Sequence, residues 1–281
     1  ALFDRVKELA GKIQGQTVVM TFDPHPLKIM RPGAEPPLIT PVQQKIALME
    51  RAGIDVILCI PFTKEFASLS AQDFVHRILL EKLRVRELVV GYDYSFGRNR
   101  EGNLDLLKQM ASSLGFGLHI VGPVYVNDIL VSSTSIRHLV REGELPSARE
   151  LLGRDYQICG TVVKGKNRGG RLLGFPTANL EPVDELIPKS GVYVVKVRLE
   201  DQIREGVTNI GWNPTFRNGE FSIETHILDF QGDLLGTTLR VDFIERLREE
   251  KTFSSVEELK KQISLDIQRA RGVLAKTAGR H

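Results

Sequence analysis

The chain has 281 residues, about twice the usual length of a single domain, so we expect two domains. Its 42% hydrophobic and 26% charged residues are typical of a soluble globular protein and argue against a disordered, collagen-like or coiled-coil chain. The net charge of +3 is too small to indicate a nucleic-acid or membrane partner. Two isolated cysteines, Cys59 and Cys159, argue against a thiol-rich metal site and a disulfide scaffold. The sequence shows no signal-peptide layout and no apolar run near the roughly 20 residues of a membrane span, so we expect a cytoplasmic protein.

The first half of the chain alternates helical and extended patterns. Four short runs are continuously apolar and rich in β-branched residues, as expected of parallel strands that are covered on both faces, and they lie at residues 17–22, 55–60, 87–91 and 118–122. This alternation predicts a doubly wound, Rossmann-like α/β domain. Such a domain normally begins with a strand, whereas this chain opens in a predicted helix without an initial Met, as though a segment upstream had been removed.

The second half of the chain has a different pattern. Runs typical of strands, broken by Gly, Pro, Asn and Asp turns, lie at residues 156–163, 191–199, 205–210, 221–230 and 238–247. Few helical patterns separate them, which indicates an antiparallel barrel or sandwich. A helix that begins near Ser255 is predicted to close the chain. We therefore place the domain boundary near residues 153–156.

A basic, glycine-rich segment at residues 160–180, GTVVKGKNRGGRLLGFPTANL, carries the strongest chemical signal. Its glycines allow backbone amides to approach phosphate oxygens closely, although such a loop alone is also typical of an ordinary hairpin. Thr177 and Asn179 alternate on one strand face, and their oxygens are hard donors that suit Mg²⁺ and phosphate. Considered alone, the pair is equally consistent with a solvated strand face.

This segment closely resembles the signature of riboflavin kinases. Further motifs follow in the order of that family: GVY at residues 191–193, IGWNPTF at 210–216, IETHILD at 223–229, and LREEKTF at 247–253. The resemblance implies a six-stranded antiparallel β-barrel at residues 154–281 that transfers the γ-phosphate of ATP to riboflavin, giving FMN. It implies that Thr177 and Asn179 bind Mg²⁺ and the nucleotide phosphates, and that Glu224 is the general base. The glycine-rich loop would contact ATP through Gly165, Lys166, Arg168, Gly169 and Gly170.

Without the resemblance, Glu224 would be interpreted as a surface carboxylate, and we interpret the neighbouring His226 as a structural residue. Residues 228–232, LDFQG, partly match the DFG motif of protein kinases. The HRD loop and the β3 lysine motif of those enzymes do not accompany it. The sequence therefore gives no support to a protein kinase.

The first half, residues 1–153, resembles the FMN adenylyltransferase module, a nucleotidyltransferase-like domain, of bacterial bifunctional FAD synthetases. The matching stretches are TFDPHP at residues 21–26, GYDYSFG at 91–97 and SSTSIR at 132–137. The resemblance implies that Ser133, Thr134 and Arg137 contact ATP phosphates, as hydroxyls and an arginine at a helix N-terminus can. It implies a flavin site lined by Asp93, Phe96 and His25. Without the resemblance, SSTSIR is explained equally well by an ordinary serine N-cap of a helix, and TFDPHP by a rigid turn at His25.

One departure from that family concerns its GxFDGxHxGH segment, which does not occur in this chain. We therefore expect the chain as given to form FMN but little or no FAD. The expected ligands are riboflavin, FMN, FAD and ATP, with Mg²⁺ and without nucleic acid or a membrane. Two other hypotheses remain: a flavin-nucleotide binding or regulatory module without turnover, and a nucleic-acid binder that uses residues 164–171. Near-neutral charge and a single short basic run disfavour the second.

Overall fold

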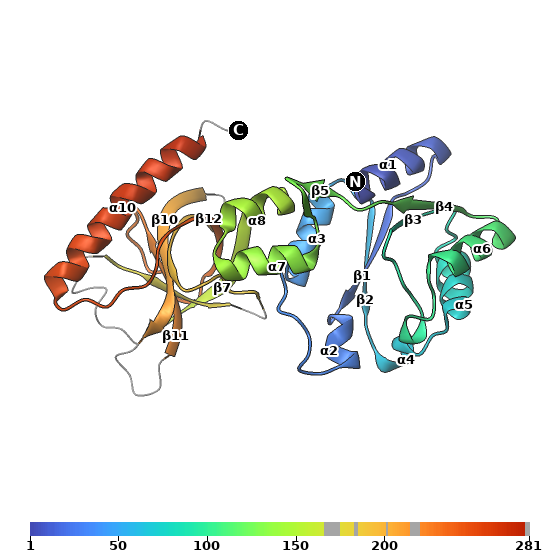
Figure 1. Cartoon of the computed structure of the whole chain (residues 1–281), viewed down its shortest axis with the longest axis horizontal. Coiled ribbons are helices and arrows are strands. Elements are labelled where there is room, and N and C mark those ends of the chain that lie inside the picture. Colours follow the sequence, from blue (N-terminus) through green and yellow to red (C-terminus); the bar gives the residue numbers. More distant parts are fainter. Residues whose placement is uncertain (166–174, 183–184, 201, 214–219, 279–281) are drawn as a thin grey trace. The chain divides into compact units, whose positions relative to one another are not determined.

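The fold was analysed in a computed structural model, which describes all residues except 166–174, 183–184, 201, 214–219 and 279–281 (Figure 1). The chain forms two compact units. Unit 1 comprises residues 1–36 and 41–124, and unit 2 comprises residues 37–40 and 125–281.

Unit 1 contains two pairs of parallel strands among its helices, which confirms the predicted α/β class. Strand β1 (Val18–Asp23) pairs in parallel with β2 (Val56–Pro61), and β3 (Glu87–Gly91) pairs in parallel with β4 (Gly117–Val121). Among the described residues no strand joins the two pairs into one sheet. The helices are α1 (Leu2–Ile13), α2 (Pro26–Met30), α3 (Val42–Arg51), α4 (Lys64–Ala67), α5 (Ala71–Asp73), the π-helix η1 (Phe74–Lys82), the 3₁₀ turn η2 (Arg98–Arg100) and α6 (Leu104–Leu114).

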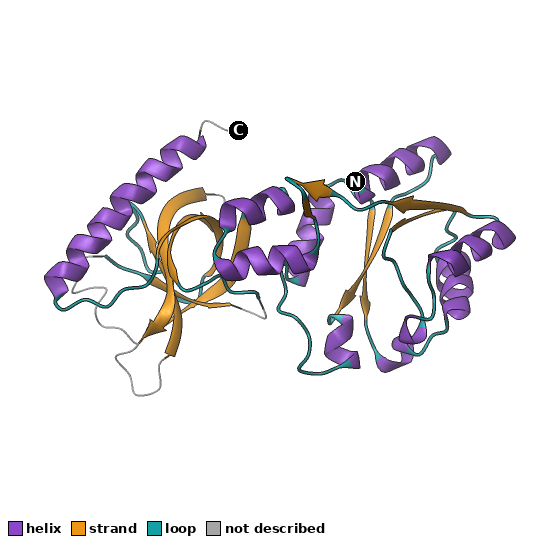
Figure 2. Cartoon of the chain, in the orientation of Figure 1, coloured by secondary structure: helices purple, strands orange, loops and turns teal. Residues whose placement is uncertain are grey.

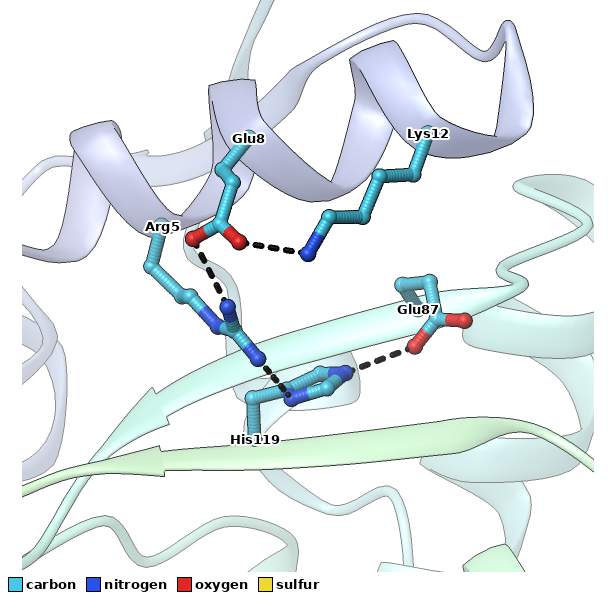
Figure 3. A network of polar contacts seen from close by, with 5 residues as sticks. All are labelled: Arg5, Glu8, Lys12, Glu87 and His119. Carbon is cyan, nitrogen blue, oxygen red and sulfur yellow. Dashed lines mark hydrogen bonds and ion pairs between the residues drawn. The ribbon is translucent and has the colours of Figure 1, made fainter.

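A polar network ties α1 to the β3–β4 pair (Figure 3). Arg5 donates hydrogen bonds to Glu8 (2.7 Å) and to Nδ1 of His119 (3.0 Å). Because a guanidinium only donates, Nδ1 is the acceptor and Nε2 carries the proton that His119 donates to Glu87 (2.7 Å). Lys12, with Arg5, lowers the pKa of Glu8 to about 2. The network fixes the first helix against two strands by side chains that remain partly exposed.

Unit 2 is built on a closed six-stranded antiparallel barrel, as predicted (Figure 2). The strand order around the barrel is β10-β11-β8-β7-β12-β9. The strands are β7 (Tyr156–Val163), β8 (Ala178–Pro182), β9 (Gly191–Leu199), β10 (Gln202–Asn213), β11 (Glu220–Ile227) and β12 (Thr238–Arg248). Alternate residues point inward, and Thr208 and Thr225, which are fully buried, share a 2.8 Å hydrogen bond there.

Helices cover two parts of the barrel. Helix α7 (Ser133–Glu142) and α8 (Leu145–Leu152) contribute Val140, Leu145 and Ala148, all fully buried, to the same core as Tyr156 and Phe243 of the barrel strands. The closing helix α10 (Val256–Ala278) packs Ala270 and Leu274 on the outer face of β9 and β12, as the amphipathic pattern predicts (Figure 1). A short hairpin of β5 (Tyr125–Val126) and β6 (Ile129–Leu130) precedes α7.

The packing of unit 2 therefore begins before the boundary that we predict near residues 153–156. Residues 37–40 also belong to this unit. Leu38 forms an isolated β-bridge with Glu185, and the Leu38 carbonyl accepts a hydrogen bond from the Leu186 amide at 2.9 Å. The boundary between two compact units need not coincide with the boundary between two catalytic domains. The assignment of one activity to residues 1–153 and another to residues 154–281 therefore stays a prediction.

Glu185 makes the stability of the protein depend on pH. This residue is 8% exposed, and its carboxylate accepts the backbone N–H of Cys159 at 3.0 and 3.1 Å. Burial raises its pKa from 4.5 to about 8. Between these values the folded chain holds a proton that the unfolded chain has released, so stability falls as the pH rises from about 4.5 to about 8.

We expect Glu185→Gln to remove this loss, because the amide cannot ionise and still accepts the Cys159 N–H. The variant should melt at a higher temperature than the original protein at pH 8 and at nearly the same temperature at pH 4.5. Between these values, each pH unit should add at most about 1.4 kcal/mol to the difference in unfolding free energy between the two proteins. Thermal melting across this range measures the difference. A constant gap between the two proteins at every pH would contradict the explanation.

Candidate functional site

The predicted kinase residues Asn179 and Glu224 lie directly opposite each other on β8 and β11. Their chain neighbours Ala178, Ile223 and Thr225 point into the barrel, so Asn179 and Glu224 share its outer face, where both are half-buried. Directly opposite residues of an antiparallel pair have Cβ atoms about 5 Å apart. The structure therefore brings together the amide and the carboxylate that the sequence separates by 45 positions.

The row of outward side chains continues onto β10, where Asn209 is the register partner of Glu224. On β11 itself, the Ser222 hydroxyl donates to Oε1 of Glu224 at 3.3 Å. Sequence reasoning missed both residues. The alternation of Ser222, Glu224 and His226 along β11 was a signal that could have placed the serine beside the carboxylate.

Gly165, at the start of the glycine-rich loop, lies against the Asn179 side chain. A Cβ on Gly165 would come within 2.3 Å of Nδ2 of Asn179, closer than any side-chain contact permits. The loop residues Lys166, Arg168, Gly169 and Gly170 lie outside the described residues. A glycine at this position thus lets the loop begin in contact with the amide that we predict to bind the nucleotide.

His226 positions the segment before β8. Its Nδ1 atom lies 2.8 Å from the Pro176 carbonyl oxygen, and its ring packs edge-on against Phe175 at 5.6 Å between centroids. Because a carbonyl only accepts, Nδ1 carries the proton. Thr177 follows directly and is exposed. The histidine therefore ties β11 to the segment that leads through Thr177 into β8, the strand of Asn179.

The predicted phosphate contacts Ser133, Thr134 and Arg137 lie on the first turns of α7, as the helix-start pattern predicts. Ser132 caps this helix by accepting the Ser135 N–H at 3.1 Å. Nε of Arg137 donates to the Pro37 carbonyl at 3.0 Å. Burial lowers the pKa of the Arg137 guanidinium. These residues belong to unit 2.

The predicted flavin contacts Asp93, Phe96 and His25 belong to unit 1. Asp93 is exposed just beyond β3, and His25 follows β1, where its Nδ1 caps α2 by accepting the Leu27 N–H at 3.2 Å. Phe96 is 6% exposed and stacks on Tyr94 with centroids 5.5 Å apart. Its ring is part of the core of this unit.

The predicted metal ligands Thr177 and Asn179 suit Mg²⁺. The Thr177 hydroxyl and the Asn179 carboxamide are neutral oxygen ligands, which commonly bind this ion together with substrate phosphates and water. Within the described ranges, no group of three or more His, Cys, Asp or Glu side chains could hold a metal alone. That the ion is bound jointly by these residues and the nucleotide phosphates stays a prediction.

Comparisons with known proteins cover both halves of the chain. The riboflavin kinase family model matches residues 152–274, and the FAD synthetase family model matches residues 1–135. A bifunctional riboflavin kinase/FMN adenylyltransferase of Listeria monocytogenes is 38% identical over 98% of this chain and 88% of its own length. One of Pseudomonas fluorescens is 37% identical over 100% of this chain and 90% of its own. The chain belongs to this bifunctional family.

A solved structure supports the same fold. The crystal structure of a Streptococcus pneumoniae protein, described as a macrolide-efflux protein, matches 96% of this chain and 88% of its own with a TM-score of 0.84 and 32% identity. Of the helices in the described part of this chain, none is long and apolar enough to cross a membrane.

The contact between Gly165 and Asn179 leads to a prediction. Gly165→Ala should push the Asn179 amide out of the row on the outer face, because the new methyl group would overlap Nδ2. We expect the KM for ATP in FMN formation to rise about tenfold, the loss typical of one hydrogen bond to a charged group. Gly272→Ala, also in unit 2, is a control, because a Cβ there meets nothing within 4 Å and, as at Gly165, its φ is not positive. An unchanged KM for ATP in Gly165→Ala would contradict the role of this contact.

Proposed function

We propose that unit 2 transfers the γ-phosphoryl group of ATP to the 5′-hydroxyl of riboflavin, giving FMN and ADP. The observation that carries this proposal is the outward row of Asn179 and Glu224, with the start of the glycine-rich loop against Asn179. The family membership supports the same reaction. Phosphoryl transfer requires alignment, charge neutralisation and a group that takes the proton of the alcohol, and little else.

In this proposal Glu224 is the general base. Its carboxylate accepts the proton of the 5′-hydroxyl as the oxygen bonds to the γ-phosphorus and the bond to the β-phosphate oxygen breaks. Ser222, which donates to Oε1, fixes the orientation of the carboxylate. Thr177 and Asn179 hold the nucleotide phosphates together with Mg²⁺, which neutralises the charge on the transferred group.

We further propose that residues 1–153 form an adenylyltransferase module, whose reaction transfers the adenylyl group of ATP to FMN and gives FAD and pyrophosphate, although we expect little FAD from the chain as given. The N-terminus of α7 supports this, because free amides and the hydroxyls of Ser133 and Thr134 suit a phosphate. Arg137, which the Pro37 carbonyl orients, would add a positive charge. Asp93 and His25 lie just beyond the carboxyl ends of β3 and β1, where open α/β sheets bind ligands.

We also propose that the protein acts in the cytoplasm on small molecules, without nucleic acid. Both cysteines are free in the structure, which suits a reducing compartment. The formal charge of +3 gives no strong attraction to a phosphate backbone.

One incubation tests the function. The protein is mixed with riboflavin, ATP and Mg²⁺, and riboflavin, FMN and FAD are separated by chromatography. FMN supports the kinase. FMN with little or no FAD is the result expected of a chain without the GxFDGxHxGH segment, and efficient FAD formation would contradict that expectation. Binding of riboflavin without any FMN would instead favour a flavin-binding module without turnover. A parallel incubation with EDTA tests whether a divalent ion is required.

A further inference from the structure

A glycine in β10 lets the segment after β12 lie against the outer face of the barrel. A Cβ on Gly211 would come within 1.8 Å of Oε1 of Glu250. The Glu250 carboxylate thus occupies the place that a side chain at position 211 would fill.

This placement brings Glu250 close to the proposed general base. Gly211 is the register partner of Ser222, and the Ser222 hydroxyl donates to Oε1 of Glu224 at 3.3 Å. The carboxylates of Glu224 and Glu250 therefore flank the same cross-strand pair. The Glu224 carboxylate extends from β11, and the Glu250 carboxylate extends over β10 from the segment that follows β12.

The strand order assigns different sides of Glu224 to the two substrates. Strand β11 lies between β8 and β10. The proposed nucleotide ligands, Asn179 and Gly165, lie on the β8 side. On the β10 side are the Asn209 amide and the Glu250 carboxylate, which can bind hydroxyl groups. A carboxylate repels phosphates, so the nucleotide is disfavoured there and the alcohol that receives the phosphoryl group is favoured.

We propose that Glu250 is a substrate-binding residue for the acceptor and accepts a hydrogen bond from a secondary hydroxyl of the ribityl chain over β10. This inference rests on the proposed riboflavin kinase function. Because Glu224 takes the proton of the terminal hydroxyl, a second carboxylate one strand away contacts a hydroxyl further along the same chain. Gly211 is then a positioning residue, since its missing side chain gives Glu250 its place.

The test compares Glu250→Ala with Glu249→Ala in the full chain. Glu249 is a matched control, because it carries the same charge one residue away and its side chain is 79% exposed. We expect Glu250→Ala to raise the KM for riboflavin about tenfold, the loss typical of a hydrogen bond to a charged group, and to leave the KM for ATP and kcat within about twofold. Glu249→Ala should change none of them.

A double-mutant cycle tests the role of Gly211. Gly211→Ala should raise the KM for riboflavin as Glu250→Ala does, and the double variant should be no worse than either single variant, because both remove one contact. Should a variant form no FMN, its dissociation constant for riboflavin, measured by flavin fluorescence, must still rise about tenfold.

Several results would overturn the inference. These are an unchanged riboflavin affinity in Glu250→Ala, a rise in the KM for ATP instead, or an equal effect of Glu249→Ala. They differ from a failure of the proposed function, in which the unaltered protein itself would form no FMN.

Discussion

Glu224→Gln is expected to slow FMN formation by about 10²-fold or more, the contribution that a general base typically makes. The amide keeps the size of the side chain and still accepts the Ser222 hydroxyl, but it cannot take the proton of the alcohol. Binding of ATP and riboflavin should change little, because the loss falls on the transfer step. In kinetic terms, kcat should fall while both KM values stay within about threefold.

Steady-state assays of FMN formation measure this result. Glu181→Gln is the matched control: Glu181 is an exposed carboxylate on β8, two residues beyond Asn179. Asn179→Ala provides the contrast, since it should weaken nucleotide binding and raise the KM for ATP. Should Glu224→Gln and Asn179→Ala lose affinity for ATP equally while kcat is unaffected, the two residues would not have the separate roles assigned here.

Local patterns in the sequence predict most of unit 2. Alternating apolar residues and regular turns identified the barrel strands except β8, and the amphipathic run at residues 256–274 identified the closing helix. The pairing of Glu224 with Asn179 could not be derived in this way, because register across strands depends on turns and side-chain packing far apart in the sequence. Only the motif resemblance indicated that the two residues share a site.

Other features depend on contacts that no local pattern reports. Residues 37–40 pack with unit 2, although they lie more than 80 positions before the hairpin at which the rest of that unit begins. The motif that contains Phe96 does not report that its ring is 6% exposed in an aromatic core, and its flavin contact stays a prediction. Gly211 and Glu250 are 39 positions apart, and only the fold shows that one makes room for the other.

Asp266→Asn is expected to destabilise unit 2 by about 3 kcal/mol or more, because it leaves a buried arginine without its counter-charge. Asp266 lies on α10 and binds Arg248 of β12 through Nε and Nη2 at 2.8–3.1 Å. The two side chains are only 3% and 12% exposed. Gln262 donates a further hydrogen bond to the same carboxylate at 2.9 Å. The bonds to Arg248 join α10 to β12, and the bond from Gln262 orients the carboxylate that makes them.

A second aspartate provides the control. Asp229, just after β11, also binds α10 through an arginine, Arg271, at 2.8 Å, but its side chain is 73% exposed. Solvent screens that pair, so Asp229→Asn should cost no more than about 1 kcal/mol. Denaturant unfolding followed by the fluorescence of Trp212, the single tryptophan, reports on the barrel, because this residue lies in β10. Equal losses in the two variants would mean that burial does not set the strength of the Arg248 pair. A large loss of unfolding free energy in Asp266→Asn alone would show that the Arg248–Asp266 pair anchors the chain two residues before Glu250.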